Sequence, residues 1–170
     1  MKNNINIIIV DDHTIFGEGL CSLLESNNYR VKRAFTSPKK ALNYLKSTNE
    51  IDLVFCDINM PEINGIDLTK KIKKINNTIK VILVSMYEDQ NIFKQAYKNN
   101  ADGYLTKKSS LSDFKKAIKY AFDDLKYTNL KTNETNETNE TNIYKDKLIL
   151  KYSLTDREKE ILTHLIKEKS

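Results

Sequence analysis

Short apolar runs alternate with longer amphipathic runs between residues 5 and about 125. Apolar residues at helical spacing indicate amphipathic helices, and short apolar runs are typical of buried strands, so the pattern predicts five βα repeats. The predicted strands are residues 5–11, 30–35, 52–57, 80–85 and 103–106. The predicted helical stripes are Phe16, Leu20, Leu23 and Leu24; Ala41, Leu42 and Leu45; Leu68, Ile72 and Ile75; Ile92, Phe93, Ala96 and Tyr97; and Phe114, Ala117, Ile118, Ala121 and Phe122.

Three of these strands are continuously apolar, at residues 7–10, 53–56 and 81–84. Such runs are typical of strands that helices cover on both faces, which places the three in the middle of a parallel sheet. The fold class expected is therefore α/β, with a five-stranded, doubly wound parallel sheet. Ser37 followed by Pro38 predicts a helix start, with the Ser37 hydroxyl as the N-cap.

The alternating pattern stops after Leu125, and residues 131–142 form the polar repeat KTNETNETNETN. This repeat has nothing apolar to bury, which predicts a flexible linker over residues 127–151, after a first domain at 1–126. Thr155 and Glu158 then form a capping-box pattern before an apolar stripe at Ile161, Leu162, Leu165 and Ile166. Residues 152–170 are therefore expected to form one amphipathic helix.

Composition narrows the class of protein. The chain has 170 residues, 39% of them hydrophobic and 30% charged, which is typical of a soluble protein with one sizeable core. No apolar run approaches the roughly 20 residues of a membrane span, and no signal peptide is evident, so we expect a cytoplasmic protein without membrane contact. The net charge of +5 permits weak attraction to nucleic acid without selecting a partner. Cys21 and Cys56 are predicted to be buried apolar residues rather than ligands or a disulfide.

Acidic side chains follow two of the predicted strands. Asp11 and Asp12 end the first strand and Asp57 ends the third, while Ser85 ends the fourth and Lys107 follows the fifth. In an open parallel sheet, ligands bind beyond the carboxyl ends of the strands. A single Asp there is most often a turn or cap residue, but acids and a lysine on several strand ends predict a site.

Three neighbouring carboxylates repel one another, so without a cation at least one should bind a proton more readily than a free Asp. Mg²⁺, with Mn²⁺ as a substitute, prefers oxygen ligands and suits Asp11, Asp12 and Asp57. A carboxylate beside such a cation can attack a phosphoryl group and form an aspartyl phosphate. Asp57 is the candidate nucleophile, and Lys107 is the candidate cation for the phosphoryl oxygens.

Four segments in this order, IIIVDDHTIFGEGL, VFCDINMPEINGIDL, VILVSMY and ADGYLTKK, resemble the receiver domain of two-component response regulators. The resemblance covers about residues 4–125 and implies the flavodoxin-like strand order 2-1-3-4-5. It implies that Asp11, Asp12 and the Asn59 backbone carbonyl hold Mg²⁺ and that Asp57 accepts a phosphoryl group from a sensor histidine kinase. Met60, Pro61 and Gly65 would shape the loop that follows.

The resemblance also implies a switch. Ser85 would turn toward the phosphoryl group, Tyr104 would turn inward with it, and Tyr87 and the Asn59 side chain would tune the phosphate lifetime. Lys107 is followed by Lys108 where the family usually has proline, so its peptide bond is expected to be trans or a strained cis bond. His13 fits the spelling of the NarL/LuxR-type subgroup and is given a structural role.

Residues 154–170 resemble the first helix of the helix-turn-helix module of that subgroup, without a recognition helix. The expected protein is a phosphoacceptor signalling protein, not a conventional enzyme, which catalyses its own phosphorylation and slow hydrolysis of the aspartyl phosphate. DNA is expected as a partner only of a complete output module, and a homodimer on phosphorylation is left open.

Three alternatives compete with this interpretation. A stand-alone or pseudo-receiver would act as an interaction module without DNA binding. A haloacid-dehalogenase-like phosphatase would need the pattern Asp-x-Asp-x-Thr on the first strand, whereas Asp11 is followed directly by Asp12. A flavodoxin-like binder of a flavin or nucleotide would need a glycine- or hydroxyl-rich phosphate loop, and acids stand at that position.

Overall fold

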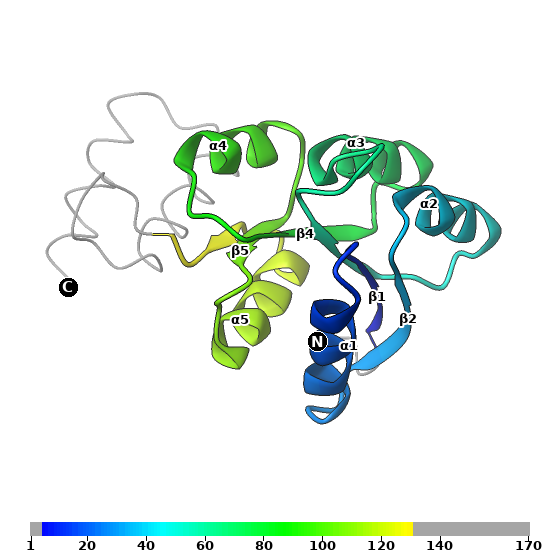
Figure 1. The fold of residues 1–170 in the computed structure, drawn as a ribbon, viewed down its shortest axis with the longest axis horizontal. Helices are drawn as coiled ribbons and strands as arrows, with labels where there is room; N and C mark the ends of the chain where they lie inside the picture. The colour runs from blue at the N-terminus through cyan, green and yellow to red at the C-terminus, as the bar shows by residue number, and fades with distance from the viewer. Residues whose placement is uncertain (1–4, 131–170) are drawn as a thin grey trace, which may run out of the picture. The chain divides into compact units, whose positions relative to one another are not determined.

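The computed structural model describes residues 5–130 as six strands that alternate with five helices (Figure 1). The strands are β1 (Asn6–Val10), β2 (Arg30–Phe35), β3 (Leu53–Asp57), β4 (Lys80–Ser85), β5 (Gly103–Thr106) and β6 (Tyr127–Thr128). The helices are α1 (Thr14–Glu25), α2 (Pro38–Ser47), α3 (Gly65–Ile75), α4 (Gln90–Lys98) and α5 (Leu111–Phe122).

All the strands of this sheet run parallel, in the order β2-β1-β3-β4-β5-β6. The prediction of a doubly wound parallel sheet with the order 2-1-3-4-5 is confirmed. The prediction of five strands is wrong by one, because residues 127 and 128 pair with β5 as β6 instead of beginning the linker. A two-residue strand has too few positions to show a periodic pattern, so only tertiary pairing reveals it. Leu130, also placed in the linker by the sequence, is buried in the core. Residues 131–151 of the expected linker and the expected C-terminal helix lie outside the described residues.

Helices cover both faces of the sheet, with α1 and α5 on one face and α2, α3 and α4 on the other (Figure 1). A hydrophobic core lies on each face of the sheet, and alternate residues of β1 belong to different cores. Ile8 and Val10 pack in the core under α2, α3 and α4, while Ile7 and Ile9 pack in the core under α1 and α5. Because side chains of a strand point alternately to opposite faces, an unbroken apolar strand is what two covered faces require.

Three local expectations are corrected by the structure. Ser37 is the N-cap residue of α2, but its side chain makes no capping hydrogen bond, so Pro38 at the start of the helix is the remaining local signal. Leu23 lies on α1 but is exposed, because the helix turns only Leu20 and Leu24 fully toward the sheet. Cys56 is fully buried as predicted, whereas Cys21 is only partly buried.

Candidate functional site

The ends of β1, β3, β4 and β5 meet along one edge of the sheet. Strand register aligns Val10 with Cys56, so Asp11 and Asp57 follow at neighbouring positions. Ser85 is aligned with Thr106 at the ends of β4 and β5, and the Lys107 amide donates to the Ser85 carbonyl at 2.7 Å. The parallel register therefore brings side chains from four separate sequence segments to a single edge, as the sequence predicts.

Two of the carboxylates are almost fully buried. Asp11 is 3% exposed and Asp57 is 2% exposed, while the side chain of Asp12 is more open at 30%. The His13 amide donates to Asp11 Oδ1 at 2.8 Å, and the Asn59 amide lies 3.4 Å from Asp57 Oδ1 in a long hydrogen bond. Backbone donors from the loops after β1 and β3 thus orient both carboxylates toward the same space.

Lys107 links these two carboxylates. Its ammonium group donates to Asp11 Oδ1 at 2.9 Å and to Asp57 Oδ2 at 3.1 Å. The side chain is only 5% exposed, and the ammonium nitrogen lies 4.7 Å from the centre of the Phe16 ring, on α1. The cation is therefore held by two charges and an aromatic face, in a position where it can also meet a group added to Asp57.

Burial and repulsion raise the pKa of Asp57 above its usual value. Desolvation is the larger cause and the charge of Asp11 is the second, while the hydrogen bond and charge of Lys107 act in the opposite direction. Burial favours the neutral form of a carboxyl group, and a neighbouring carboxylate does the same. The sequence predicts that at least one of the crowded acids binds a proton more readily than a free Asp. Asp57 is the residue that has this raised pKa.

Four side chains at this edge lie close enough together to hold a cation. One ligand atom each from Asp11, Asp12, His13 and Asp57 lies within 4.8 Å of all the others. Asp12 Oδ1 and Asp11 Oδ2 are buried and make no hydrogen bond among the described residues, although the His13 Nδ1 atom lies 3.1 Å from the first and the Lys107 ammonium nitrogen 2.7 Å from the second. Carboxylate oxygens with spare acceptor capacity, gathered from three residues, fit a hard divalent cation such as Mg²⁺.

His13 and Phe16 are the contributors that the sequence argument did not place in the site. The Nδ1 atom of His13 lies 3.1 Å from Asp12 Oδ1, 3.4 Å from Asp11 Oδ1 and 3.7 Å from Asp57 Oδ2. It is also 3.4 Å from the Lys107 ammonium nitrogen. The position of His13 directly after Asp11 and Asp12 in the sequence could have indicated that it belongs to the site. For Phe16, membership of a helical apolar stripe gave no sign of its contact with Lys107.

The expected switch residues are joined through the loop between β4 and α4. The Tyr87 amide donates to Ser85 Oγ at 3.1 Å, and the Tyr104 hydroxyl donates to the Tyr87 carbonyl at 3.0 Å. The Tyr104 side chain is fully buried and packs edge-on against Phe93, with ring centres 5.8 Å apart. The sequence expects Tyr104 to turn inward, and the inward position is the one described here. Tyr87 itself points outward and is 66% exposed.

The loop after β3 is fixed by a close backbone approach at Gly65. The Gly65 amide donates to the Ile58 carbonyl at 2.9 Å, and an added Cβ would lie 2.2 Å from the Asp57 carbonyl oxygen. Met60 is buried, while Pro61 and the Asn59 side chain are exposed. Position 65 therefore has no room for a side chain, and only glycine allows this close approach to the end of β3. The peptide between Lys107 and Lys108 is trans, because the described residues contain no cis bond.

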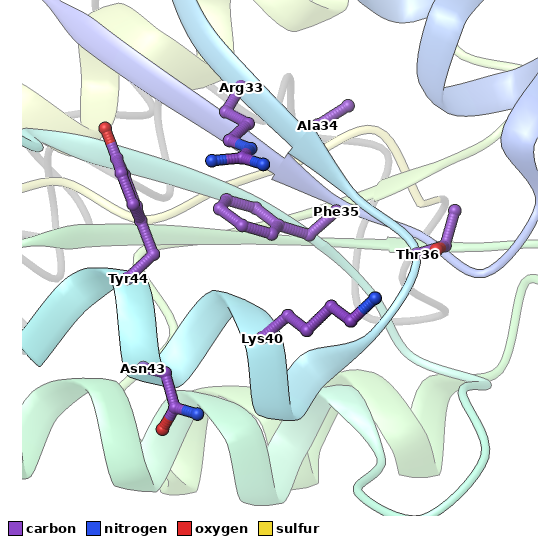
Figure 2. Close-up of a pocket in the computed structure, with 7 residues that line it drawn as sticks. All are labelled: Arg33, Ala34, Phe35, Thr36, Lys40, Asn43 and Tyr44. Carbon is purple, nitrogen blue, oxygen red and sulfur yellow. The ribbon is translucent and has the colours of Figure 1, made fainter.

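A separate cavity of about 380 Å³ lies between β2 and α2, and Phe35 in its wall accepts a hydrogen bond from the Asp11 amide at 3.0 Å. Figure 2 shows the Arg33 guanidinium group beside the Phe35 ring, 5.2 Å from its centre, with Tyr44 next to them. None of the predicted site residues lines this cavity. No helix in the described part of the chain has the length and apolar character needed to cross a membrane.

Comparison with known proteins shows the family to which the chain belongs. The sequence profile of the family described as "Response regulator receiver domain" matches residues 7–119. Transcriptional regulatory protein DegU of Brevibacillus brevis is 29% identical over 119 residues, which is 69% of this chain and 50% of that protein. Transcriptional regulatory protein LnrK of Bacillus subtilis is 35% identical over 115 residues, covering 67% of this chain and 52% of that protein. The chain thus spans about half the length of these curated relatives.

Solved structures show the same similarity. A LuxR-family two-component response regulator from Aurantimonas sp. has a TM-score of 0.67 and 25% identity, covering 74% of this chain and 89% of that one. The isolated REC domain of RcsB from Salmonella enterica, solved with a phosphomimetic BeF3-, has a TM-score of 0.67 and 27% identity, covering 74% and 94%.

Proposed function

Since the chain belongs to the response regulator receiver domain family, we propose that Asp57 is its phosphoacceptor and that a sensor histidine kinase supplies the phosphoryl group. The observation that carries this proposal is the shared ion pair of Lys107 with Asp11 and Asp57. A buried carboxylate that faces an ammonium group has the nucleophile and the counter-charge for phosphoryl transfer already in place.

The transfer step follows from this arrangement. A carboxylate oxygen of Asp57 attacks the phosphorus of a phosphohistidine, a new P–O bond forms, and the P–N bond breaks. The electron pair of that bond leaves with the imidazole, which takes up a proton from solvent. The Lys107 ammonium, 3.1 Å from Asp57 Oδ2, pairs with the incoming phosphoryl oxygens. Slow attack of water on the same phosphorus returns the carboxylate and inorganic phosphate, so the protein is a signalling acceptor rather than a conventional enzyme.

The cation that we propose for this site is Mg²⁺, with Mn²⁺ as a substitute. Asp11, Asp12 and Asp57 would hold it together with the backbone carbonyl of Asn59. When bound, Mg²⁺ supplies positive charge that offsets the carboxylates and the phosphoryl oxygens. The Oδ1 atom of Asp12 supports this assignment, because it is buried and makes no hydrogen bond among the described residues, and the group 3.1 Å from it is the His13 imidazole, which is charged only when protonated.

The output of the switch is proposed to pass through Ser85, Tyr87 and Tyr104. A phosphoryl group on Asp57 would accept the Ser85 O–H and turn this hydroxyl toward itself, and that turn would break the hydrogen bond that the Ser85 oxygen now accepts from the Tyr87 amide. Tyr104, which holds the Tyr87 carbonyl, would transmit the change to the β4–α4 loop. Tyr87 and the Asn59 side chain are exposed near this edge, which supports their proposed role in tuning the phosphate lifetime.

The named relatives DegU and LnrK are transcriptional regulatory proteins, which supports the proposal that this receiver controls a transcriptional output. The segment at 152–170, proposed as the first helix of a helix-turn-helix module, lies outside the described residues. The activity of any complete output module, including sequence-specific DNA binding, therefore stays a proposal. So does a homodimer formed on phosphorylation, which gel filtration with and without a beryllium fluoride mimic would test through a change in elution volume.

Intact-mass measurement after treatment with acetyl phosphate and Mg²⁺ tests the phosphoacceptor directly. We expect one added phosphoryl group on the native chain, none on Asp57→Asn, and strongly slowed labelling of Lys107→Ala. Asp67→Asn is the matched control, because Asp67 is exposed and pairs only with neighbours on its own helix and its N-cap. Labelling of Asp57→Asn at the native rate, or no labelling of the native chain, would refute the proposal.

A further inference from the structure

A basic groove lies at the opposite edge of the sheet from the carboxylates, near the starts of β4 and β5. Its volume is about 480 Å³, and its walls come from the C-terminal ends of α3 and α4 and from the turn after α5. The charged side chains that line it are Lys70, Lys73, Lys74, Lys98, Lys126 and Asp102. We call these six residues and the space between them the lysine groove.

The single acid of the lysine groove is already engaged. Asp102 Oδ2 accepts from the Lys73 ammonium at 2.6 Å and from the Val81 amide at 2.8 Å, and its other oxygen is 3.6 Å from the Lys80 ammonium. Lys80 pairs in turn with Asp124 at 2.7 Å. Asp102 is therefore shared among several donors, and it cannot neutralise the other lysines of the groove.

Helix ends provide the simple explanation for lysines at these positions. Lys73 and Lys74 lie in the last turn of α3 and Lys98 in the last turn of α4, where the helix dipole favours cations. Each helix end supplies only about half a negative charge. Asp102 and Asp67, which pairs with Lys70 at 2.9 Å, supply one each. Against five lysines, this leaves an excess of about two positive charges, so the dipoles do not account for the cluster.

Lys126 shows the effect of this excess. Its ammonium donates to the Tyr97 carbonyl at 3.1 Å and lies 4.7 Å from the centre of the Tyr97 ring. Partial burial lowers the pKa of Lys126, and the charge of Lys73 lowers it further, although Asp102 acts in the opposite direction. A bound anion would relieve this repulsion.

The side chains of the groove fit phosphate better than a protein or a drug-sized ligand. Protein interfaces are depleted of lysine and enriched in aromatic residues at their centre, and small-molecule pockets are mostly apolar. Here Ala101 is the one apolar residue among the described residues that line the groove, and the uncharged polar residues are Asn77, Asn99 and Asn100. Lysine and asparagine are among the side chains that contact the phosphates of nucleic acids.

We propose that the lysine groove binds the sugar–phosphate backbone of double-stranded DNA without reading its sequence. Lysine ammonium groups match successive single charges along a phosphate backbone, and contacts of this kind carry no sequence information. The site is remote from Asp57, so this inference does not depend on phosphorylation. It would hold the receiver against DNA that another part of a regulator selects.

Fluorescence anisotropy of the full chain with a labelled 20-base-pair duplex of arbitrary sequence tests the proposal. We expect binding at 50 mM salt that weakens steeply toward 200 mM. The double variant Lys74→Glu/Lys98→Glu should lose about tenfold or more in affinity at 50 mM salt, and the magnitude of its slope of log K against log salt should fall by about 2. Lys74→Arg/Lys98→Arg, which keeps both charges, should bind as the native chain does.

The matched control is Lys46→Glu/Lys119→Glu. These lysines are exposed in the last turns of α2 and α5, so the control makes the same change in net charge and in helix-end charge outside the groove. It should lose less than about threefold, through long-range attraction only. Thermal melts verify that every variant is folded.

Three results would overturn the inference. Equal weakening by the groove and control variants would show that net charge alone attracts DNA. Displacement of the duplex by polyglutamate as efficiently, per charge, as by unlabelled duplex would indicate an acidic protein partner instead. Absence of binding by the native chain at 50 mM salt would exclude a DNA site. A failure of Asp57 to accept phosphate would leave all three outcomes unchanged, so the two proposals fail separately.

Discussion

Lys107 and Asp57 form a buried ion pair in which the ammonium nitrogen lies 3.1 Å from Oδ2 and both side chains are at most 5% exposed. The two residues are separated by 50 positions in the chain and meet because β3 and β5 end at the same edge of the sheet. Lys107 also pairs with Asp11, so one cation serves two buried carboxylates. Stability and chemistry at this site are therefore coupled.

Replacing Lys107 by alanine should lower the free energy of unfolding by about 3 kcal/mol at neutral pH, because two buried carboxylates lose their counter-charge. Urea unfolding measures this change. Lys39→Ala is the matched control, since the Lys39–Glu62 pair at 3.1 Å is exposed, and its loss should cost less than about 1 kcal/mol. Equal losses for the two variants would show that burial of the Lys107 pair has no energetic consequence.

Asp57→Asn should stabilise the protein at neutral pH, by no more than about 3 kcal/mol, because the amide removes a buried charge that Asp11 repels. The pH dependence follows from the raised pKa of Asp57. Below the usual Asp pKa, the Asp57 carboxyl group is protonated in both the folded and the unfolded chain, so its charge does not lower the free energy of unfolding. As the pH rises, the unfolded chain loses this proton first, so the native protein loses stability until the pH passes the folded pKa.

The gain from Asp57→Asn should therefore be full at neutral pH and disappear in acid, when urea unfolding is repeated across the pH range. Asp67→Asn is the comparison, because the pKa of Asp67 is lowered by its hydrogen bond with Lys70. Its substitution should not stabilise the protein at any pH. A gain for Asp57→Asn that persists unchanged in acid would contradict the assigned charge effect.

Mg²⁺ should raise the melting temperature of the native chain in a saturable manner, since a ligand that binds only the folded state stabilises it. At 100 times its dissociation constant, the gain is about 2.7 kcal/mol. Asp12→Asn should shift this titration to higher Mg²⁺, because it removes a charged carboxylate whose Oδ1 atom is buried in the site without a hydrogen bond among the described residues. Chelation with EDTA should reverse the shift. Asp52→Asn, at the other end of β3, serves as the control and should titrate as the native chain does.

Gly65→Ala should destabilise the protein by about 2 kcal/mol or more, because the new Cβ would lie 2.2 Å from the Asp57 carbonyl oxygen and 2.9 Å from the Ile58 Cα. It should also slow phosphorylation by displacing Asp57. Gly17→Ala is the matched control: nothing lies within 4 Å of its Cβ, and alanine in a helix should gain about 0.5–1 kcal/mol. Thermal unfolding distinguishes the two, and a neutral Gly65→Ala would refute the steric argument.

Tyr104→Phe should cost about 1 kcal/mol, the usual net value of one hydrogen bond, because the Tyr87 carbonyl loses its donor. Amide hydrogen exchange should become faster in the loop of residues 86–89, while exchange in β1 stays as it was. Tyr120→Phe, on the opposite face of the sheet, is the control for loss of a tyrosine hydroxyl. No change in loop exchange would show that Tyr104 does not hold the β4–α4 loop.

Hydrophobic periodicity was sufficient to determine most of this fold. The continuous apolar runs of β1, β3 and β4 predicted central strands, and acids directly after β1 and β3 predicted a cluster at one edge, because parallel strands end together. Local patterns carry such information wherever burial repeats with the period of the backbone. The same patterns predict that Asp11, Asp57 and Lys107 lie in one cluster, because each stands at the end of a predicted strand.

Tertiary structure alone decided the remaining features, because they depend on contacts between segments distant in sequence. The pairing of β6 with β5, the Phe16 ring beneath the Lys107 ammonium, and the approach of His13 to three carboxylates follow from packing that no local pattern records. The lysine groove is a further example, since its lysines come from three separate segments and look in the sequence like ordinary solvated positions. Sequence sets which side chains face a core or an edge, whereas distances between them are fixed only when the elements pack.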